Sequence, residues 1–307
     1  MAKIRMWAAC TICVIEDIYA ASESAGLDEA AKQETVNETL KMLDRELPRG
    51  EVPSYYITEA HRILKRVSGM EDPFVKERRL CNEVGLKAAE RVDREQKAMS
   101  DDYQRFRFLV KWAVSGNMID IRTVGTVYSF GDSLYNQLLE TFREGLAIDD
   151  IDPIFWLIRK PRKILYVLDN VGEIALDGLL IRELKRHGNS VTVAVRGGPM
   201  TSDATIEDLV LVGADKVADK VITTGSDTLG FIMGQASAEF IQEIADVDLT
   251  IGKGQANFYS LSTNRASFAG DVASLFRTKC DCISSLFGKE GKIGVAALIA
   301  AGEKQQG

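Results

Sequence analysis

The segment KILYVL at residues 163–168 decides the fold, because DNVGE at 169–173 and an amphipathic stretch at 174–186 follow it directly. A short apolar run that ends in Asp-Asn and passes into a helical pattern is typical of a buried strand and its crossover helix. Further apolar runs at 190–195, 220–224 and 248–251 alternate with helical segments in the same way. The second half of the chain is therefore predicted to be α/β with a mainly parallel sheet.

In the first half of the chain, the apolar residues recur at a different spacing. Apolar residues recur at steps of three and four in 28–47, 54–67, 74–98, 103–114 and 134–142, which predicts a series of helices. The period changes near 150–163, where Pro153 and Pro161 interrupt the chain. We therefore predict a helical subdomain over residues 1–155 and an α/β metal- and phosphate-binding domain over 156–307.

Composition narrows the classes of protein. The 307 residues are 46% hydrophobic and 27% charged with a net charge of −7, as in a soluble globular protein. This acidic balance without a basic stripe argues against a nucleic-acid partner. The apolar stretch 6–15 continues at helical spacing past Glu16 and Asp17, so we expect a first helix and no signal peptide. The closing apolar run 293–301 is shorter than the roughly 20 residues that span a bilayer. We expect a cytoplasmic protein without a membrane partner, and its oligomeric state stays open.

The cysteines leave one alternative open. Cys10 and Cys13 have the spacing of half a zinc site, which Cys280 and Cys282 could complete. Neither pair lies in a glycine-rich turn, so we favour small apolar residues on a helix and a strand. The odd total of five cysteines suits a reducing compartment.

Several chemistries are excluded by the residues. Only two histidines are present, which rules out a three-histidine zinc site; we expect His61 on a partly exposed helix face and His187 in a helix's last turn. There is no GxSxG for a nucleophilic serine and no GxGxxG for a dinucleotide. Gly252-Lys253-Gly254 lacks the Walker spacing.

Polar residues instead follow four of the predicted strands, at 169–170, 196–203, 225–227 and 253. Ligands bind at the carboxyl ends of parallel strands, although Asp and Gly also form ordinary turns there. Asp169, the Asn170 side-chain oxygen and Asp203 would suit an octahedral divalent ion. Such an ion, with a lysine nearby, predicts metal-assisted phosphoryl chemistry.

Structural readings of the same residues compete with this one. Asp169 and Asn170 could cap the following helix, and Asp203 lies where a helix opening near 202–203 would be capped. We expect Asp203 in an open cleft, where its removal would cost about 1 kcal/mol or less. Asp208 is expected to be a solvated helix residue.

A family resemblance brings these segments together. The motifs are LDNVGE at 168–173, SDATIED at 202–208 after VRGGP at 195–199, GKGQANF at 252–258 and RTKC at 277–280. The early Cys-x-x-Cys, the stretch DPF at 72–74 and GNMID at 116–120 also match. In this order and over nearly the whole chain, they resemble the "domain of unknown function 89" family of metal-dependent damage-control phosphatases, in its archaeal type. The resemblance implies a helical N-terminal subdomain beside a Rossmann-like three-layer α/β/α domain.

The resemblance also implies roles for single residues. The metal ligands would be Asp169, Asn170 and Asp203, with Mn²⁺, Ni²⁺, Co²⁺ or Mg²⁺ as the ion. Asp169, Asn170 and Lys279 would take part in catalysis. The residues that would bind a small phosphorylated metabolite, such as a sugar phosphate or a damaged phosphometabolite, are Glu173, Lys253, Asn257 and Lys279, with Asn117 and Asp120 in the pocket wall.

Some questions stay open at this level. Tyr259 stands where the family usually has a charged residue, so neither branch's substrate is transferred to this chain. Asn117 and Asp120 could simply end a helix, and the Lys279 stem could pack against Leu275 and Ile283 without binding phosphate. A non-catalytic protein that binds a phosphometabolite or nucleotide in the same cleft is the main alternative function. A methyltransferase is a weaker one, because only one glycine follows the first strand. Direct attack by water and an aspartyl-phosphate intermediate both remain possible.

Overall fold

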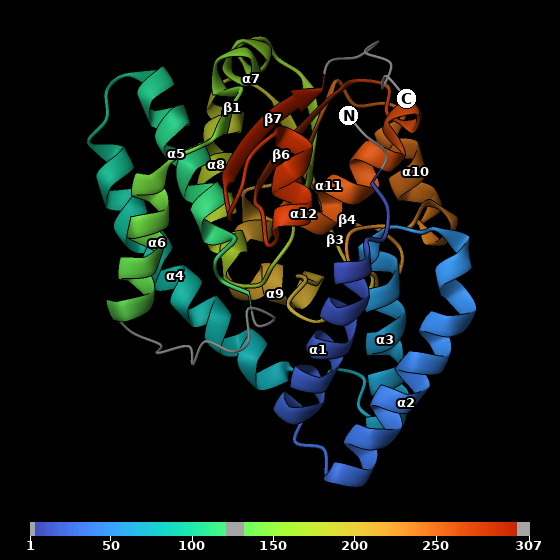
Figure 1. Ribbon diagram of the computed structural model, residues 1–307. Helices are drawn as coiled ribbons and strands as arrows, with labels where there is room; N and C mark the ends of the chain where they lie inside the picture. Colours follow the sequence, from blue (N-terminus) through green and yellow to red (C-terminus); the bar gives the residue numbers. More distant parts are fainter. Residues whose placement is uncertain (1–3, 121–131, 300–307) are drawn as a thin grey trace.

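A computed structural model describes residues 4–120 and 132–299 of the chain, and a seven-stranded sheet lies at its centre (Figure 1). The strands are β1 (Ile148–Asp149), β2 (Lys163–Val167), β3 (Ser190–Val195), β4 (Lys220–Thr223), β5 (Leu249–Lys253), β6 (Asp271–Arg277) and β7 (Gly294–Ile299). Their order across the sheet is β1-β7-β6-β5-β2-β3-β4.

The sheet is mainly parallel, as predicted. Strands β2 to β6 run in one direction, whereas β7 is antiparallel to β6 and parallel to β1. The five parallel strands therefore bring their carboxyl ends to one edge. The chain adds β3 and β4 on one side of β2 and then places β5 on the other side. This topological switch point between β2 and β5 is where open α/β sheets form their ligand crevice.

The part of the chain that the structure describes also contains twelve α-helices. They are α1 (Ala8–Ser24), α2 (Glu29–Glu46), α3 (Pro53–Ser68), α4 (Val75–Lys97), α5 (Asp102–Gly116), α6 (Asp132–Glu144), α7 (Ile151–Ile158), α8 (Glu173–Arg186), α9 (Ile206–Leu211), α10 (Ala238–Ile244), α11 (Gly254–Thr263) and α12 (Asp281–Ser284). Short 3₁₀ turns occur at Leu47–Arg49, Ala214–Lys216, Met233–Gln235, Arg265–Ser267 and Ser285–Phe287.

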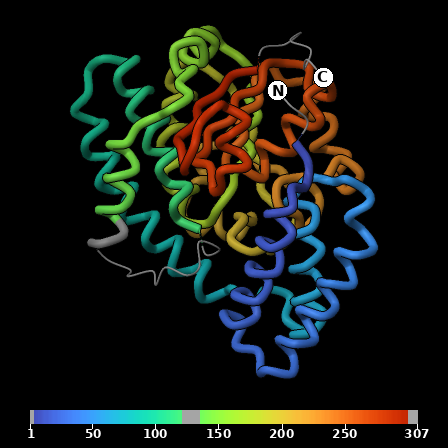
Figure 2. The backbone as a smooth tube through the Cα atoms, in the orientation of Figure 1, coloured from blue at the N-terminus to red at the C-terminus, as the bar shows by residue number. Residues whose placement is uncertain are grey.

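The helices of the first half form two groups. Helices α1, α2 and α3 pack on one another and extend from one end of the molecule, as the blue part of the trace in Figure 2 shows. Helices α4 and α5 instead pack on α8, and α5 also contacts β6 and β7. Helix α8 thus lies beneath other helices, and most of its residues are buried, including Glu173 and Asp177. A helix buried on nearly all sides can carry buried charge only where partners are provided.

Most predicted elements are confirmed to within a few residues, including the helices of the first half and strands β2 to β5. Strands β1, β6 and β7 were not predicted; β6 contains Asp271, Ser274 and Arg277 among its apolar residues, which hides its strand pattern. Helix α9 begins at Ile206, later than the expected start near 202–203. The predicted domain boundary at 155/156 falls inside α7 and stays a prediction.

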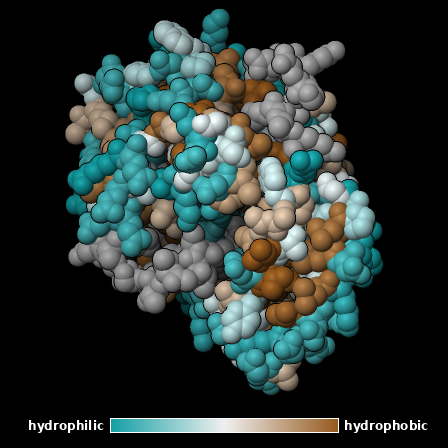
Figure 3. All heavy atoms as spheres, in the orientation of Figure 1, coloured by the Kyte–Doolittle hydropathy of each residue, from teal (hydrophilic) through white to brown (hydrophobic). Residues whose placement is uncertain are grey.

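The N-terminal apolar stretch forms part of a helix, as expected. Helix α1 buries Val14 and Ile18, while Ile12 is 63% exposed on its outer face. Figure 3 shows apolar atoms gathered over this helix on an otherwise mostly hydrophilic face. Among the described helices, none combines the length and apolar character needed to cross a bilayer.

The crossing of α4 and α8 generates a first prediction. A Cβ added at Gly85 would lie 2.0 Å from the backbone oxygen of Gly172, which has no flexible end that could move aside. We expect Gly85→Ala to lower the free energy of unfolding by about 1–3 kcal/mol, the usual cost of overpacking. Denaturant unfolding measures the change. Gly234→Ala is the matched control, since that position has open space around it; equal stability of the two variants would contradict the prediction.

Candidate active site

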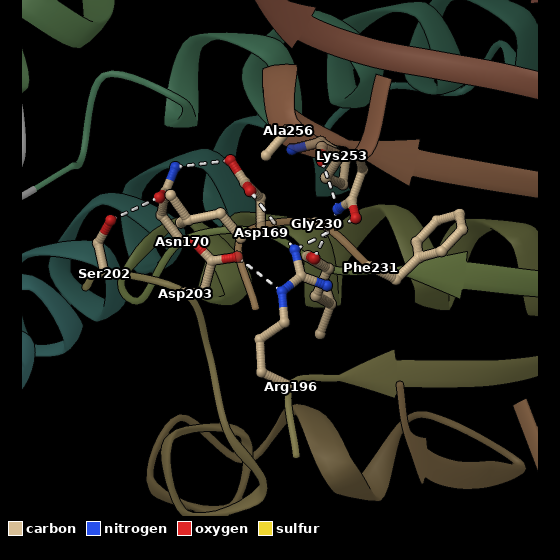
Figure 4. A network of polar contacts seen from close by, with 12 residues as sticks. Asp169, Asn170, Arg196, Ser202, Asp203, Gly230, Phe231, Lys253 and Ala256 are labelled. Atoms are coloured by element: carbon tan, nitrogen blue, oxygen red, sulfur yellow. Dashed lines mark hydrogen bonds and ion pairs between the residues drawn. The ribbon is translucent and has the colours of Figure 1, made fainter. Parts of the chain in front are cut away.

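The carboxyl ends of four strands converge at the switch point. Asp169 and Asn170 follow β2, Arg196 follows β3, Lys253 ends β5 and the Lys279 loop follows β6. The chain after β3 returns across this edge, and isolated bridge pairing places Asp203 against Asn170. Two backbone bonds fix the return: Ala204 N donates to Asp169 O at 2.7 Å, and Val171 N donates to Ser202 O at 2.7 Å. Figure 4 shows the resulting cluster of side chains.

Arg196 contacts both of the predicted carboxylate ligands. Its Nε donates to Asp203 Oδ2 at 2.6 Å, and its Nη2 lies 3.8 Å from Asp169 Oδ1. The same Nη2 donates to Asn257 Oδ1 at 3.2 Å. Asp203 is fully buried, so the expectation that it lies in an open cleft is wrong; the guanidinium and the returning loop cover it.

On the other side of the site, two side-chain amides donate hydrogen bonds to the carboxylates. Asn170 Nδ2 donates to Asp169 Oδ2 at 2.9 Å and to Glu173 Oε2 at 3.0 Å. Asn117, at the end of α5, donates to the same two oxygens at 3.0 and 2.9 Å. Asn170 Oδ1 lies 2.8 Å from Ser202 Oγ. The helical half of the chain therefore contributes directly to the site.

Lys253 lies below the site in a closed network. Its Nζ pairs with Glu173, lies 3.1 Å from Asp177 Oδ1, and donates to Ala113 O at 2.9 Å. Burial raises the pKa of the Glu173 carboxyl to about 7, although Lys253 opposes this shift. Burial alone would lower the pKa of the Lys253 ammonium, but Asp177 and Glu173 raise it. Tyr166 completes the network by donating to Asp177 Oδ1 at 2.7 Å.

Lys279 lies at the accessible side of the site. Its ammonium pairs with Asp120, whose Oδ1 also accepts from Ser202 Oγ at 2.6 Å. Both Lys279 and Asp120 line a cavity of about 370 Å³. Gln255 Oε1 accepts from Lys279 N at 2.8 Å, and Gln255 Nε2 donates to the Tyr259 hydroxyl at 2.5 Å. Tyr259 thus braces the loop that carries Lys279.

Gly254 allows β2 and β5 to meet at the site. It has φ +74°, and a Cβ there would lie 1.8 Å from Asp169 Oδ2. The glycine of the KGxxN segment is therefore required by the Asp169 carboxylate, which occupies the space of the missing side chain.

Two expectations from local patterns, for Asp208 and His61, are wrong, and the alternative of helix capping is excluded. Helix α8 has Gly172 as its N-cap and α9 has Thr205, so Asp169, Asn170 and Asp203 do not cap these helices. Asp208 is buried and pairs with Arg78 and Asn82. His61 is also buried, with Nε2 2.8 Å from Asp17 Oδ2. His187 is the C-cap of α8, one residue beyond the last turn in which it was expected.

The cysteines of the two sequence pairs, all four with free thiols, line the same cavity as Lys279. Cys10 and Cys13 lie on α1, while Cys280 and Cys282 lie at the start of α12 and not on a strand. Burial raises the pKa of Cys10 to about 11, so its thiol is neutral near pH 7. Within residues 4–120 and 132–299, no three His, Cys, Asp or Glu side chains have an arrangement that could hold a metal ion.

The candidate ligands Asp169, Asn170 and Asp203 are two carboxylates and an amide, which is the oxygen donor set that hard divalent ions prefer. The charge of their surroundings also fits such an ion. Among the described residues, the ion pairs of the cluster join five carboxylates to three cations, so carboxylates outnumber cations there. The carboxylates are Asp120, Asp169, Glu173, Asp177 and Asp203, and the cations are Arg196, Lys253 and Lys279.

Comparison with known proteins identifies the family. The model of the damage-control phosphatase ARMT1-like domain matches residues 6–293. A damage-control phosphatase of Archaeoglobus fulgidus is 32% identical over 278 residues, which cover 90% of this chain and 92% of that protein. The chain belongs to the damage-control phosphatase family. The uncharacterized protein MJ0202 of Methanocaldococcus jannaschii is 31% identical over 281 residues, 91% of this chain and 90% of its own.

A solved structure supports the same assignment. The DUF89 family protein PH1575 of Pyrococcus horikoshii superposes with a TM-score of 0.82 at 27% identity, over 95% of this chain and 98% of that one. The resemblance and the mixed α/β fold with a helical N-terminal region are therefore confirmed. The names of the damage-control phosphatase relatives support a phosphatase role for this chain.

Sequence reasoning overlooked several members of the cluster. Arg196 was counted among polar strand ends without a role, and Ser202, Asp177 and Tyr166 were not singled out. Arg196 could have been found, because it directly follows an apolar strand and precedes a glycine pair. Asp177 has no such signal, since an acidic residue within a helix is usually solvated.

The Lys253 network generates a second prediction. Lys253→Met would leave Glu173 and Asp177 buried without their cation, which typically costs 3–5 kcal/mol. We expect a correspondingly large loss of stability in chemical denaturation. Lys163→Met is the matched control, because the Lys163–Asp246 pair is exposed and its loss should leave the unfolding midpoint nearly unchanged. A small change for both variants would show that Lys253 is not the required counter-charge.

Proposed function

We propose that this chain is a metal-dependent phosphatase that hydrolyses phosphomonoesters of small metabolites, such as sugar phosphates or damaged phosphometabolites. The observation that carries the proposal is the buried cluster at the switch point, in which carboxylates outnumber cations among the described residues and a lysine lies on the accessible side. The phosphatase relatives support the reaction class.

Asp169, Asn170 and Asp203 would hold the divalent ion, Mn²⁺, Ni²⁺, Co²⁺ or Mg²⁺. A bound ion supplies a Lewis acid for the phosphoryl oxygens and lowers the pKa of a coordinated water. Asn170 Nδ2 donates to Asp169 and Glu173, and Asn170 Oδ1 faces Ser202 instead of Asp169. Ligation of an ion shared with Asp169 would therefore require the amide to turn so that its oxygen faces that carboxylate.

Lys279 would bind the phosphoryl group. It is paired with Asp120 beside the cavity, and its side chain is 25% exposed, so a phosphate oxygen can approach the ammonium from the open side. Asp120 would hold Lys279 ready in the absence of substrate. Positive charge fixed before the substrate arrives stabilises the charge that develops on the phosphoryl oxygens.

The remaining predicted residues would act through others. Lys253 and Glu173 are fully buried and paired, so we assign them to positioning Asn170 and Asn117. Asn257 donates to Leu168 O at 2.9 Å and to Lys253 O at 2.7 Å, and thereby joins the ends of β2 and β5. Asn117 accepts from Arg277 N at 3.2 Å and links α5 to the strand before Lys279.

Hydrolysis of p-nitrophenyl phosphate tests the reaction and separates it from the alternative of a non-catalytic binding protein. We expect phosphate release with at least one of the four ions, its loss on chelation and its return when the ion is restored. Asp203→Asn should abolish this activity, because one anionic ligand is lost, and should cost about 2 kcal/mol of stability through Arg196. A folded Asp203→Asn variant that turns over at saturating Mn²⁺ would remove Asp203 from the metal site.

Three variants at Lys279 test its role in binding phosphate. Lys279→Ala should lose most of the activity, and Lys279→Arg should recover part of it because a cation remains. Lys279→Met keeps the length and the apolar stem but lacks the charge, so we expect it to resemble Lys279→Ala. Phosphate release is compared at equal metal loading, with circular dichroism as the control for folding. An active Met variant beside an impaired Arg variant would assign Lys279 a structural role.

A further inference from the structure

Arg196 has an unusual place among the buried charges of this protein. Its side chain is 1% exposed, and its side-chain partners among the described residues all belong to the site: Asp203, Asp169 and Asn257. In Figure 4 the guanidinium lies beside the two carboxylates, joined to them by dashed lines. One cation of the protein thus contacts both carboxylates that the proposed function assigns to the metal ion.

We propose that Arg196 is a built-in counter-ion of the metal site: it holds Asp169 and Asp203 together in the metal-free protein, and its charge lowers their affinity for a divalent cation. This inference rests on the proposed function, in which the two carboxylates bind the ion. Arg196 acts through them and is a positioning residue.

The first step of the argument is the cost of the empty site. Asp169 is 3% exposed and Asp203 is fully buried, and two buried carboxylates in one site repel each other and are poorly hydrated. Arginine stays protonated inside proteins, so it supplies a charge that does not depend on pH in the working range. The metal-free fold therefore depends on Arg196 for part of the compensation that an ion would otherwise provide.

The second step is that Arg196 cannot easily leave when an ion arrives. Its backbone N donates to Ala204 O at 2.9 Å, which closes the loop that carries Asp203. Its Nη2 donates to Asn257, whose own amide is anchored on the ends of β2 and β5. The guanidinium and the ion would share the same two carboxylates in a buried site, where their repulsion is only weakly screened.

These two effects have opposite signs, which makes the inference testable. Removing the charge of Arg196 should destabilise the metal-free protein and at the same time tighten ion binding. An arginine that merely supports the structure would, on removal, reduce both the stability and the affinity.

The experiment measures Mn²⁺ affinity by calorimetry and melting temperature with and without Mn²⁺. We expect Arg196→Gln to melt several degrees lower than the wild type in chelator and to bind Mn²⁺ about tenfold or more tightly. Arg196→Lys keeps the charge, but its side chain is shorter and ends in a compact ammonium instead of a planar guanidinium. We expect it to bind Mn²⁺ with an affinity between those of the wild type and Arg196→Gln. Arg105→Gln is the matched control: Arg105 is also buried but pairs with Glu183 and Asp102 between α5 and α8. It should lose stability with no gain in affinity.

Unchanged or weaker Mn²⁺ binding in Arg196→Gln would overturn the inference, and if that variant does not fold, unchanged or weaker binding in Arg196→Lys would do so. Failure of the proposed function has a different signature: the wild type would bind no divalent ion, or would bind it as well as Asp203→Asn does. Wild-type binding that Asp203→Asn abolishes, with no gain in either Arg196 variant, would leave the metal site in place and reject the role of Arg196.

Discussion

Burying five carboxylates in one cluster is the constraint on which the rest of this structure depends. Each carboxylate loses hydration on folding and must be compensated by a cation or by hydrogen-bond donors. The cations are Arg196, Lys253 and Lys279, and they come from the ends of β3, β5 and β6. A parallel arrangement brings these ends to one edge, so the topology of the sheet supplies the compensation.

Close backbone approach is the second requirement of the site. Gly254 leaves room for the Asp169 carboxylate where β5 passes β2, and a Cβ at Gly172 would lie 2.3 Å from Cys81 O on α4. Helix α4 therefore lies directly on the turn that presents Asn170. Asn117 and Asp120, at the end of α5, add an amide and a carboxylate to the same cluster. The helical first half thus contributes two polar groups to the site as well as covering the sheet.

The local patterns of the sequence were reliable for the elements that position the site. The alternation of apolar runs and helical segments predicted β2 to β5 and the crossover helices, because buried parallel strands are apolar along their whole length. Local reasoning failed for Asp208, His61 and the exposure of Asp203. Asp208 is buried by Arg78 on α4, and His61 is paired with Asp17 on α1. These partners are far away in the sequence, and no local pattern around Asp208 or His61 predicts them.

The sequence by itself determined which residue types stand at the strand ends and that oxygen ligands outnumber every other metal-binding group. These properties are local, since they follow from periodicity and from the chemistry of single side chains. Only the tertiary structure decided which charges pair with one another. Lys253 pairs with Glu173 and Asp177. Lys279 pairs with Asp120, and Arg196 pairs with Asp169 and Asp203. The physical reason is that the pairing of buried charges depends on distances between segments remote in sequence, and folding alone sets those distances.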